Sequence, residues 1–230
     1  MELRLDGKNA LVTGASSGLG WRFATALAAA GARVAVAARR ADRLETLKAE
    51  IERTGGRAHT VTLDVTDVAS VRAGVAAAAA ALGPLDILVN NSGVSVTKRA
   101  GDVEETDYDF VMDTNAKGAF FVAQAAGRAM IAAKRPGRII NIASAAGLRA
   151  LALEWGRYGI NVNALCPGYI ETEINRDYWE TEGGRKLVAM LPRRRVGKPE
   201  DLDGLLLLLA SEHSGFVNGA VIAADDGLTV

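Results

Sequence analysis

Apolar residues in this chain fall into short runs rich in β-branched side chains and longer runs with helical spacing, and the two kinds alternate along the sequence. A short apolar run bounded by turn-forming residues is typical of a strand that is buried on both faces of a sheet. Such runs predict strands at Asn9–Thr13, Arg33–Ala38, His59–Leu63, Ile87–Asn90, Arg138–Ile142, Asn161–Leu165 and Ala220–Ala224.

The stretches between these strands have the apolar spacing of helices. They predict helices at Leu19–Ala30, Ala41–Thr54, Val68–Leu82, Tyr108–Ala133 (with an early break) and Pro199–Leu209. Strands that alternate with helices predict a doubly wound α/β fold, here a seven-stranded parallel sheet with helices on both faces. Because no repeat and no linker divides the chain, we expect residues 1–230 to form a single domain.

A long segment, residues 170–197, separates the last two predicted strands. A connection of this length in a compact domain usually covers a site. We therefore expect an insertion that covers the substrate. Its residues Tyr178 and Trp179 would either contact the substrate or pack the insertion onto the body of the domain.

The charge balance narrows the range of partners. Lys and Arg number 27, as do Asp and Glu, so the chain lacks the basic excess that would favour nucleic acid or an anionic membrane. Small molecules and other protein subunits remain as possible partners. One cysteine, Cys166, and two histidines predict neither a disulfide nor a metal site. The charged N-terminus and the shortness of the most apolar run, Leu205–Ala210, predict a cytoplasmic protein without a membrane span.

Glycines cluster where the first predicted strand meets the first helix, in the sequence Thr13-Gly14-Ala15-Ser16-Ser17-Gly18-Leu19-Gly20. Glycines let a backbone approach a pyrophosphate closely, and a helix N-terminus offers the anion free N–H groups. In this strand–turn–helix context the cluster predicts Rossmann-type dinucleotide binding rather than a tight turn alone.

Further motifs follow in a fixed order: Asp64-Val65, Asn90-Asn91-Ser92-Gly93, Asn115, Ser144, Pro167-Gly168 with Thr172, Asn218-Gly219 and Asp226-Gly227. With the glycine cluster, they resemble the short-chain dehydrogenase/reductase family over nearly the whole chain. The resemblance implies an NAD(P)-dependent oxidoreductase acting on the CH–OH group of a small substrate, of the 3-oxoacyl, sugar-acid or polyol type. It implies cofactor contacts at Gly14, Ser16, Ser17, Gly18, Leu19, Gly20, Arg39, Arg40, Asp64, Val65, Asn91, Ser92, Gly93, Pro167, Gly168, Ile170 and Thr172.

The end of the second predicted strand bears on the choice between NAD and NADP. An acidic residue there would bond the ribose hydroxyls of NAD, whereas arginine accommodates the 2′-phosphate of NADP. Ala38 stands at the acidic position and Arg39 and Arg40 follow it, while Ser17 stands where many NADP-preferring members carry a basic residue. Because guanidinium groups pair bidentately with phosphate, the sequence favours NADP. NAD is the alternative if the two arginines only solvate a helix start.

The chemistry implied by the resemblance uses a serine, an asparagine, a tyrosine, and a lysine four residues after the tyrosine. Ser144 would hold the substrate oxygen and Asn115 a relay water, while the tyrosine would act as general acid and base with its pKa lowered by the lysine. No Tyr-x-x-x-Lys follows Ser144. Tyr158 is rejected, because Val162 stands four residues later and Arg157-Tyr158-Gly159 predicts the turn into the sixth strand, at the far end of the sheet.

The length of one crossover indicates what is missing. After Ser144 a helix can use only about Leu148–Trp155, roughly 12 Å, although it must recross a strand of about 17–20 Å. We therefore expect that a segment of about twenty residues bearing the tyrosine and the lysine belongs between about Leu148 and Ala152. The alternative is a true deletion, which leaves a catalytically silent cofactor-binding or scaffold protein. The resemblance also implies a homotetramer or homodimer, built partly from the Tyr108–Ala133 helix.

Overall fold

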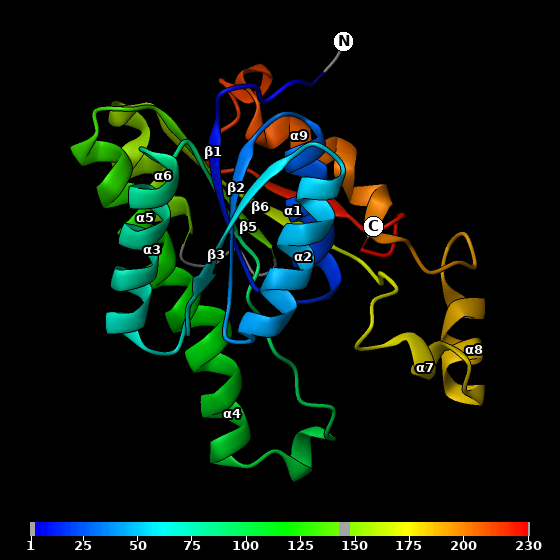
Figure 1. Cartoon of the computed structure of the whole chain (residues 1–230). Coiled ribbons are helices and arrows are strands. Elements are labelled where there is room, and N and C mark those ends of the chain that lie inside the picture. The colour runs from blue at the N-terminus through cyan, green and yellow to red at the C-terminus, as the bar shows by residue number, and fades with distance from the viewer. Residues whose placement is uncertain (1–2, 143–147, 230) are drawn as a thin grey trace.

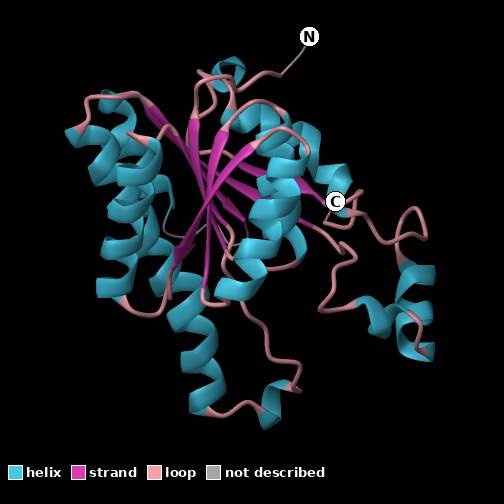
Figure 2. Ribbon diagram, viewed as in Figure 1, coloured by secondary structure: helices cyan, strands magenta, loops and turns pink. Residues whose placement is uncertain are grey.

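The computed structural model of the chain describes residues 3–142 and 148–229. Within them, one parallel sheet has the strand order β3-β2-β1-β4-β5-β6-β7 (Figures 1 and 2). The strands are β1 (Asn9–Thr13), β2 (Arg33–Ala38), β3 (Arg57–Thr62), β4 (Ile87–Asn90), β5 (Gly137–Ile142), β6 (Ile160–Pro167) and β7 (Val221–Ala224). Every neighbouring pair is parallel, which confirms the predicted doubly wound fold.

Helices cover both faces of this sheet (Figure 1). On one face lie α1 (Gly18–Ala29), α2 (Ala41–Arg53) and α9 (Asp203–Ala210). On the other lie α3 (Val68–Leu82), α5 (Ala119–Ala132) and α6 (Leu148–Trp155). The remaining α-helices are α4 (Glu105–Met112), α7 (Arg176–Trp179) and α8 (Glu182–Met190), and short 3₁₀ turns occupy Ala100–Asp102, Gly156–Tyr158, Pro199–Leu202 and Glu212–Ser214.

Strand β1 shows how the apolar runs hold the two layers together. Leu11 is buried in the cluster formed with α3, α5 and α6, whereas Val12 is buried in the cluster formed with α1, α2 and α9. Successive side chains of a strand point to opposite faces, so a strand covered on both sides needs a continuous apolar run. Each such buried side chain stabilises the fold by about 1.5–3 kcal/mol.

Most predicted boundaries agree with the structure, and the differences have local causes. The predicted helix Tyr108–Ala133 does break early: α4 ends at Met112, a π-helical turn covers Asp113–Gly118, and α5 begins at Ala119. β3 begins two residues earlier than predicted, because Arg57 and Ala58 pair with β2 although the side chain of one is polar and that of the other is small. Helix α6 has the predicted bounds and runs unbroken through residues 148–152. The structure therefore shows no break at the place where a missing segment was expected, and this continuity counts against a gap there.

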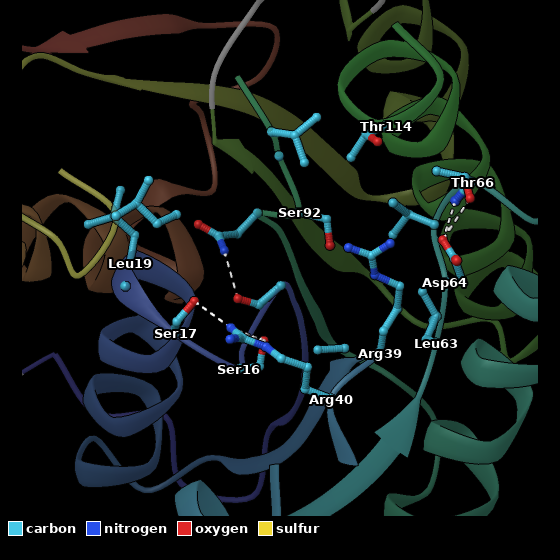
Figure 3. A pocket seen from close by; sticks show the side chains of 18 of the residues that line it. Ser16, Ser17, Leu19, Arg39, Arg40, Leu63, Asp64, Thr66, Ser92 and Thr114 are labelled. Carbon is cyan, nitrogen blue, oxygen red and sulfur yellow. Dashed lines mark hydrogen bonds between the residues drawn. The ribbon is translucent and has the colours of Figure 1, made fainter. Parts of the chain in front are cut away.

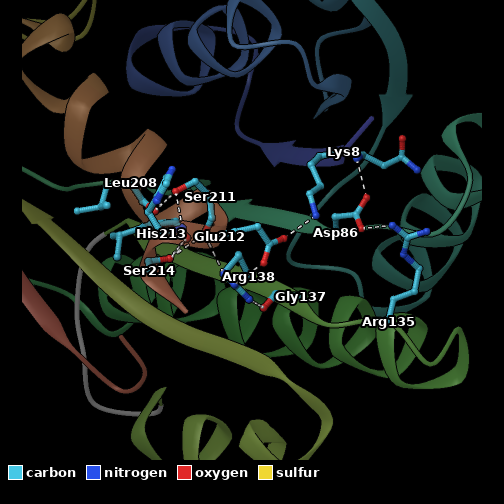
Figure 4. Close-up of polar contacts among 12 residues, drawn as sticks. Lys8, Asp86, Arg135, Gly137, Arg138, Leu208, Ser211, Glu212, His213 and Ser214 are labelled. Carbon is cyan, nitrogen blue, oxygen red and sulfur yellow. Dashed lines mark hydrogen bonds and ion pairs between the residues drawn. The ribbon is translucent and has the colours of Figure 1, made fainter. Parts of the chain in front are cut away.

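Polar side chains are bonded together at the amino ends of the central strands (Figure 4). Asp86, which is 5% exposed, accepts a hydrogen bond from the backbone N–H of Asn9 (2.9 Å) and an ion-paired one from Arg135 (2.6 Å). Close by, the buried Arg138 donates to the carbonyl of Ser211 and to Glu212. Through Asp86, the start of β1 is joined to the loop that precedes β5. Through Arg138, β5 is joined to the turn that follows α9.

Replacing Asp86 with alanine is expected to lower the free energy of unfolding by about 2 kcal/mol, because the buried N–H of Asn9 loses its acceptor and Arg135 its counterion. Urea denaturation followed by circular dichroism measures the change. Glu182→Ala is the matched control, because the carboxylate of Glu182 is exposed and pairs with the exposed Lys186. We expect this control to change stability by less than about 1 kcal/mol. Equal effects of the two substitutions would contradict the assignment.

Across residues 3–142 and 148–229, no helix combines the length and the apolar character that crossing a membrane requires.

Candidate functional site

A cavity of about 420 Å³ lies beyond the carboxyl ends of β1, β2, β3 and β4 (Figure 3). The strand order reverses between β1 and β4, and ligands of doubly wound sheets bind at such a switch point. The cavity brings together most of the residues that the sequence assigned to the cofactor: Gly14, Ser16, Ser17, Gly18, Leu19, Arg39, Arg40, Asp64, Val65, Asn91, Ser92, Gly93 and Thr172.

The turn from β1 into α1 forms one wall of this cavity and depends on its glycines. Gly14 and Gly18 have φ values of +65° and +56°, a left-handed conformation that other residues rarely adopt. Gly20 does not line the cavity; a Cβ placed on it would lie 2.3 Å from the carbonyl oxygen of Gly14. Its role is therefore close packing of the helix against the turn. The free N–H groups at the start of α1 make this wall suitable for a pyrophosphate.

Hydrogen bonds from the end of β4 hold the glycine turn in place. The Thr13 hydroxyl accepts from the backbone N–H groups of Asn91 (3.0 Å) and Ser92 (3.2 Å). The Asn91 amide donates to the carbonyl oxygen of Thr13 at 3.1 Å. Because these contacts span the switch point, they fix the distance between the two strand ends that frame the cavity.

Two arginines and one aspartate are the charged residues that line the cavity. The backbone N–H of Thr66 bonds the carboxylate of Asp64 and lowers its pKa below the ordinary value, with further lowering from the Thr66 hydroxyl and the charge of Arg39 and an opposing effect of burial. Asp64 is therefore an ionised acceptor. Neither Arg39 nor Arg40 forms an ion pair with a carboxylate in the described part of the chain.

Asn115 lies in the π-helical turn between α4 and α5, and such turns often occur at functional sites. Its side-chain amide donates to the carbonyl oxygen of Val94 and accepts from the N–H of Val94, both at 2.8 Å. This pair of bonds fixes the amide beside Gly93, whose ideal Cβ position is 3.5 Å from Asn115 Oδ1. Ser144, the other predicted catalytic residue, lies outside the described residues.

The structure also places Tyr158, which the sequence analysis rejected as a catalytic residue, and the single cysteine. Tyr158 ends the 3₁₀ turn before β6, at the amino end of that strand and thus at the sheet edge opposite the cavity. Cys166 lies near the carboxyl end of β6, where burial raises the pKa of its thiol and keeps it protonated.

Some predicted cofactor residues lie outside the cavity, and some lining residues were not predicted. Gly168 and Ile170 line a second cavity of about 310 Å³ beside β7, while Pro167 ends β6 without lining either. The lining residues that the sequence analysis did not assign to the cofactor are Ala38, Leu63, Thr66, Val94, Thr114 and Ile174. All but Ile174 are next to predicted residues or follow the same strands, which is the signal that could have found them.

The segment 170–197 closes on itself at its base. Backbone bonds of 2.8 Å join Glu171 to Gly197 and Gly197 to Tyr169. The ring of Trp179 packs edge-on against Tyr178 inside the segment and against Tyr169 just before it, at 5.2 and 5.6 Å between ring centroids. Trp179 therefore packs the segment onto its own base, while α7 and α8 lie away from the sheet (Figure 1).

Comparison with known proteins agrees with this geometry. Two family profiles match, short chain dehydrogenase over residues 8–150 and Enoyl-(Acyl carrier protein) reductase over residues 146–229. Gluconate 5-dehydrogenase of Gluconobacter oxydans is 38% identical and covers 98% of this chain and 96% of its own length. D-threitol dehydrogenase of Mycolicibacterium smegmatis is 35% identical, over 100% and 95%.

A solved structure of a dehydrogenase is also similar to this chain. The crystal structure of a gluconate 5-dehydrogenase from Burkholderia cenocepacia in complex with NADP and tartrate has a TM-score of 0.93, is 35% identical, and covers 99% of this chain and 97% of that one. The motifs, the strand order and the cavity at the switch point point to the same assignment. The chain belongs to the short-chain dehydrogenase/reductase family.

Proposed function

We propose that the chain is an oxidoreductase that transfers a hydride between NADP(H), or less readily NAD(H), and the CH–OH group of a sugar acid or polyol. The observation that carries the proposal is the cavity at the switch point, where a glycine turn lies beside the guanidinium groups of Arg39 and Arg40, which pair with no carboxylate among the described residues. A dinucleotide with an added phosphate supplies the negative charge that such a site lacks. The NADP complex of the Burkholderia relative supports this choice.

The residues present fit a nicotinamide dinucleotide. Gly14 and Gly18 allow the backbone to approach the pyrophosphate, and the N-terminus of α1 favours its negative charge. Asp64, kept ionised by Thr66, accepts a hydrogen bond from the adenine. The nicotinamide, when bound, supplies or accepts the hydride. Asn115, held by Val94, orients a water in the proton relay.

The substrate class follows from the relatives rather than from the cavity. A gluconate 5-dehydrogenase and a D-threitol dehydrogenase are 38% and 35% identical to this chain over nearly their whole lengths. Their names indicate a sugar acid and a polyol. We therefore place sugar acids and polyols before the 3-oxoacyl thioesters that the sequence motifs alone left open.

No Tyr-x-x-x-Lys pair of the kind that proton transfer requires follows Ser144 in the 230 residues. We propose that the active protein contains this pair in an additional segment between about Leu148 and Ala152, where α6 now runs. The alignment with the Gluconobacter enzyme runs over 247 positions, so at least 17 of them hold no residue of this chain. Helix α6 meets α5 where the ring of Trp155 fills the space beside Gly127. At the other end of α5, Phe120 is 40% exposed, as expected if part of its helical partner is missing.

The second candidate function is a silent cofactor-binding protein. It is favoured by the lining of the cavity, because neither a tyrosine nor a lysine is among the described residues that line it. A protein of this kind would bind NADP(H) through the cavity and turn over slowly.

Protein isolated from its natural source distinguishes the two candidates. If the segment is present, its intact mass is expected to exceed 24.1 kDa by about 2 kDa, the mass of the missing helical residues. The same preparation is expected to oxidise NADPH in the presence of keto-sugar acids, with kcat/KM at least about tenfold above that for NADH. A mass of 24.1 kDa with NADPH binding but no turnover would support the silent protein. Equal use of NADH would contradict the NADP preference.

We also propose that copies of the chain assemble as a homotetramer or homodimer. Tyr108, Phe110 and Met112 expose apolar surface on α4, and Val221 does so on the edge strand β7. Exposed large apolar side chains of this kind are candidates for contacts between subunits. Elution as a monomer from a calibrated native column would contradict the proposal.

A further inference from the structure

The segment 170–197 meets the nucleotide-binding half of the domain at the start of α1. A Cβ placed on Gly18 would lie 3.6 Å from Cβ of Thr172, so the segment passes beside the glycine turn. Thr172 and Ile174 both line the cavity at the switch point. Because Ile174 is 81% exposed, it lies at the mouth of this cavity and not in its depth. These two residues form the edge of the cavity that the segment supplies.

Glu173, between these two lining residues, does not line the cavity and has a different partner. Its carboxylate pairs at 3.1 Å with Nη2 of Arg43, in the first turn of α2. Both partners line an adjoining cavity of about 490 Å³. The residues that the two cavities have in common are Ser17, Gly18 and Thr172. The ion pair therefore lies behind a wall of the cavity at the switch point.

Arg43 is held in place by the nucleotide-binding half itself. Its Nε donates to the carbonyl oxygen of Ser16 in the glycine turn, at 3.3 Å. Its guanidinium also lies over the ring of Trp21 in α1, 5.5 Å from the ring centroid. The indole N–H of Trp21 in turn donates to Glu50 of α2. One side chain thus contacts the glycine turn, α1 and the segment, so it can fix the position of the segment relative to the turn.

The pair between Arg43 and Glu173 is the polar link from the outer part of the segment to the body of the domain. In the part of the chain that the structure describes, no other hydrogen bond or ion pair joins residues 172–190 to residues outside 169–197. The side chains of Arg43 and Glu173 are 39% and 59% exposed. Exposed ion pairs are weak and are screened by salt, which suits a contact that opens and closes.

We infer that Arg43 and Glu173 are positioning residues that hold the segment against the glycine turn, and that their ion pair sets the rate at which the dinucleotide leaves the cavity. The inference rests on the proposed function and deepens it. Residues 172–174 border the cavity beside the turn that faces the pyrophosphate, so their displacement opens it for release. Opening of such a cover often limits turnover. The pair acts through the backbone of the segment and not through contact with the cofactor.

The first test measures the dissociation of NADPH, which needs no catalytic residue. The complex is mixed with excess NADP⁺ in a stopped-flow instrument, and the fluorescence of the reduced nicotinamide gives the rate constant. Glu173→Gln removes the charge but keeps the size of the side chain. It is expected to raise the dissociation rate constant about three- to fivefold, and the difference is expected to disappear in about 0.5 M salt. In an Arg43→Gln protein the same change is expected to have less than about a 1.5-fold effect, because the partner is already gone.

Glu171→Gln is the matched control, because Glu171 belongs to the same segment but pairs with Arg176 inside it. It is expected to leave the dissociation rate constant of NADPH unchanged. Binding of 2′,5′-ADP, the adenosine half of NADP, shows whether the nucleotide half of the cavity is intact. Its dissociation constant from calorimetry is expected to stay within about twofold in Glu173→Gln, because neither Glu173 nor Arg43 lines this cavity.

A second measurement follows the segment itself and needs no ligand. The N–H of Thr172 donates to the side chain of Asn175 at 2.7 Å, and the N–H of Arg176 donates to the carbonyl of Thr172 at 3.0 Å. Hydrogen exchange of these amides reports the opening of the turn. Glu173→Gln is expected to speed their exchange about three- to fivefold. Amides of α5 are the internal control and are expected to exchange at an unchanged rate.

Several results would overturn the inference. Unchanged dissociation or unchanged exchange in Glu173→Gln would do so, as would an equal effect of Glu171→Gln on dissociation. Weaker binding of 2′,5′-ADP in Glu173→Gln would show damage to the nucleotide half and would reduce the pair to a structural contact. If the unchanged protein binds neither NADPH nor 2′,5′-ADP, the proposed function fails together with the inference. If NADPH dissociates as expected but hydride transfer is absent even with the additional segment, the inference stands and the oxidoreductase proposal fails.

Discussion

Inserting a segment of about twenty residues that carries a tyrosine and, four residues later, a lysine between about Leu148 and Ala152 is expected to raise the rate of NADPH oxidation by roughly 10²–10⁴-fold over the 230-residue chain, the usual contribution of a positioned general acid and base. A free phenol has a pKa near 10, so a neighbouring lysine is needed to make it an effective acid and base at neutral pH. The other parts of the site are in place: the cavity, the fixed Asn115 and the glycine turn. Single-turnover measurements of nicotinamide absorbance give the rate.

The control carries the same insertion with phenylalanine in place of the tyrosine. It restores the length of the crossover without the phenolic group, so a gain that comes from folding alone would appear in both proteins. We expect binding of 2′,5′-ADP to be the same, within about twofold, in the chain with and without the insertion, because the nucleotide half of the cavity is formed by other elements. A 230-residue chain as fast as the inserted one would sink the proposal that it needs this segment.

The fold could be predicted from the sequence because local pattern and tertiary structure agree at its strands. β1, β2 and β4 have the predicted bounds, since each is a continuous apolar run buried on both faces. Helix α3 also begins as predicted, after Asp67, whose carboxylate accepts from the N–H of Ala69. Where no such local signal exists, prediction failed: α7 and α8 are short, half-exposed helices inside the segment 170–197, and nothing in its pattern separates them from loop.

The cavity could be predicted in outline and not in detail. Most lining residues could be predicted from glycines and motif residues that follow the strands, because parallel strands bring their carboxyl ends to the same edge of the sheet. The contacts between them are long-range. The bond from Arg40 to Ser17 joins residues 23 positions apart, and no spacing rule connects them. Gly168 was assigned to the cofactor by motif, yet a Cβ placed on it would lie 2.7 Å from Cα of Asp225, so packing against the chain after β7 accounts for its lack of a side chain.

Gly20→Ala is expected to lower the free energy of unfolding by about 3 kcal/mol, at the upper end of the cost of forcing one methyl group into packed structure. The new Cβ would lie 2.3 Å from the carbonyl oxygen of Gly14 and 2.6 Å from Nδ2 of Asn91. The first of these neighbours is backbone and cannot rotate away, so α1 must shift relative to β1. The same shift moves the N–H groups that face the pyrophosphate, and affinity for NADPH is expected to fall at least about tenfold.

Gly204→Ala is the matched control, because Gly204 also lies in the first turn of a helix, α9, but has no neighbouring atom within 4 Å of its ideal Cβ position. There alanine gains helix propensity and meets no obstacle, so we expect stability to stay equal or rise by up to about 1 kcal/mol, with unchanged NADPH binding. Urea denaturation and calorimetry measure both quantities. If Gly20→Ala and Gly204→Ala had the same effect on stability and binding, the role assigned to Gly20, close packing of α1 against the turn, would be wrong. A fall in affinity without a fall in stability would instead assign Gly20 to direct contact with the cofactor.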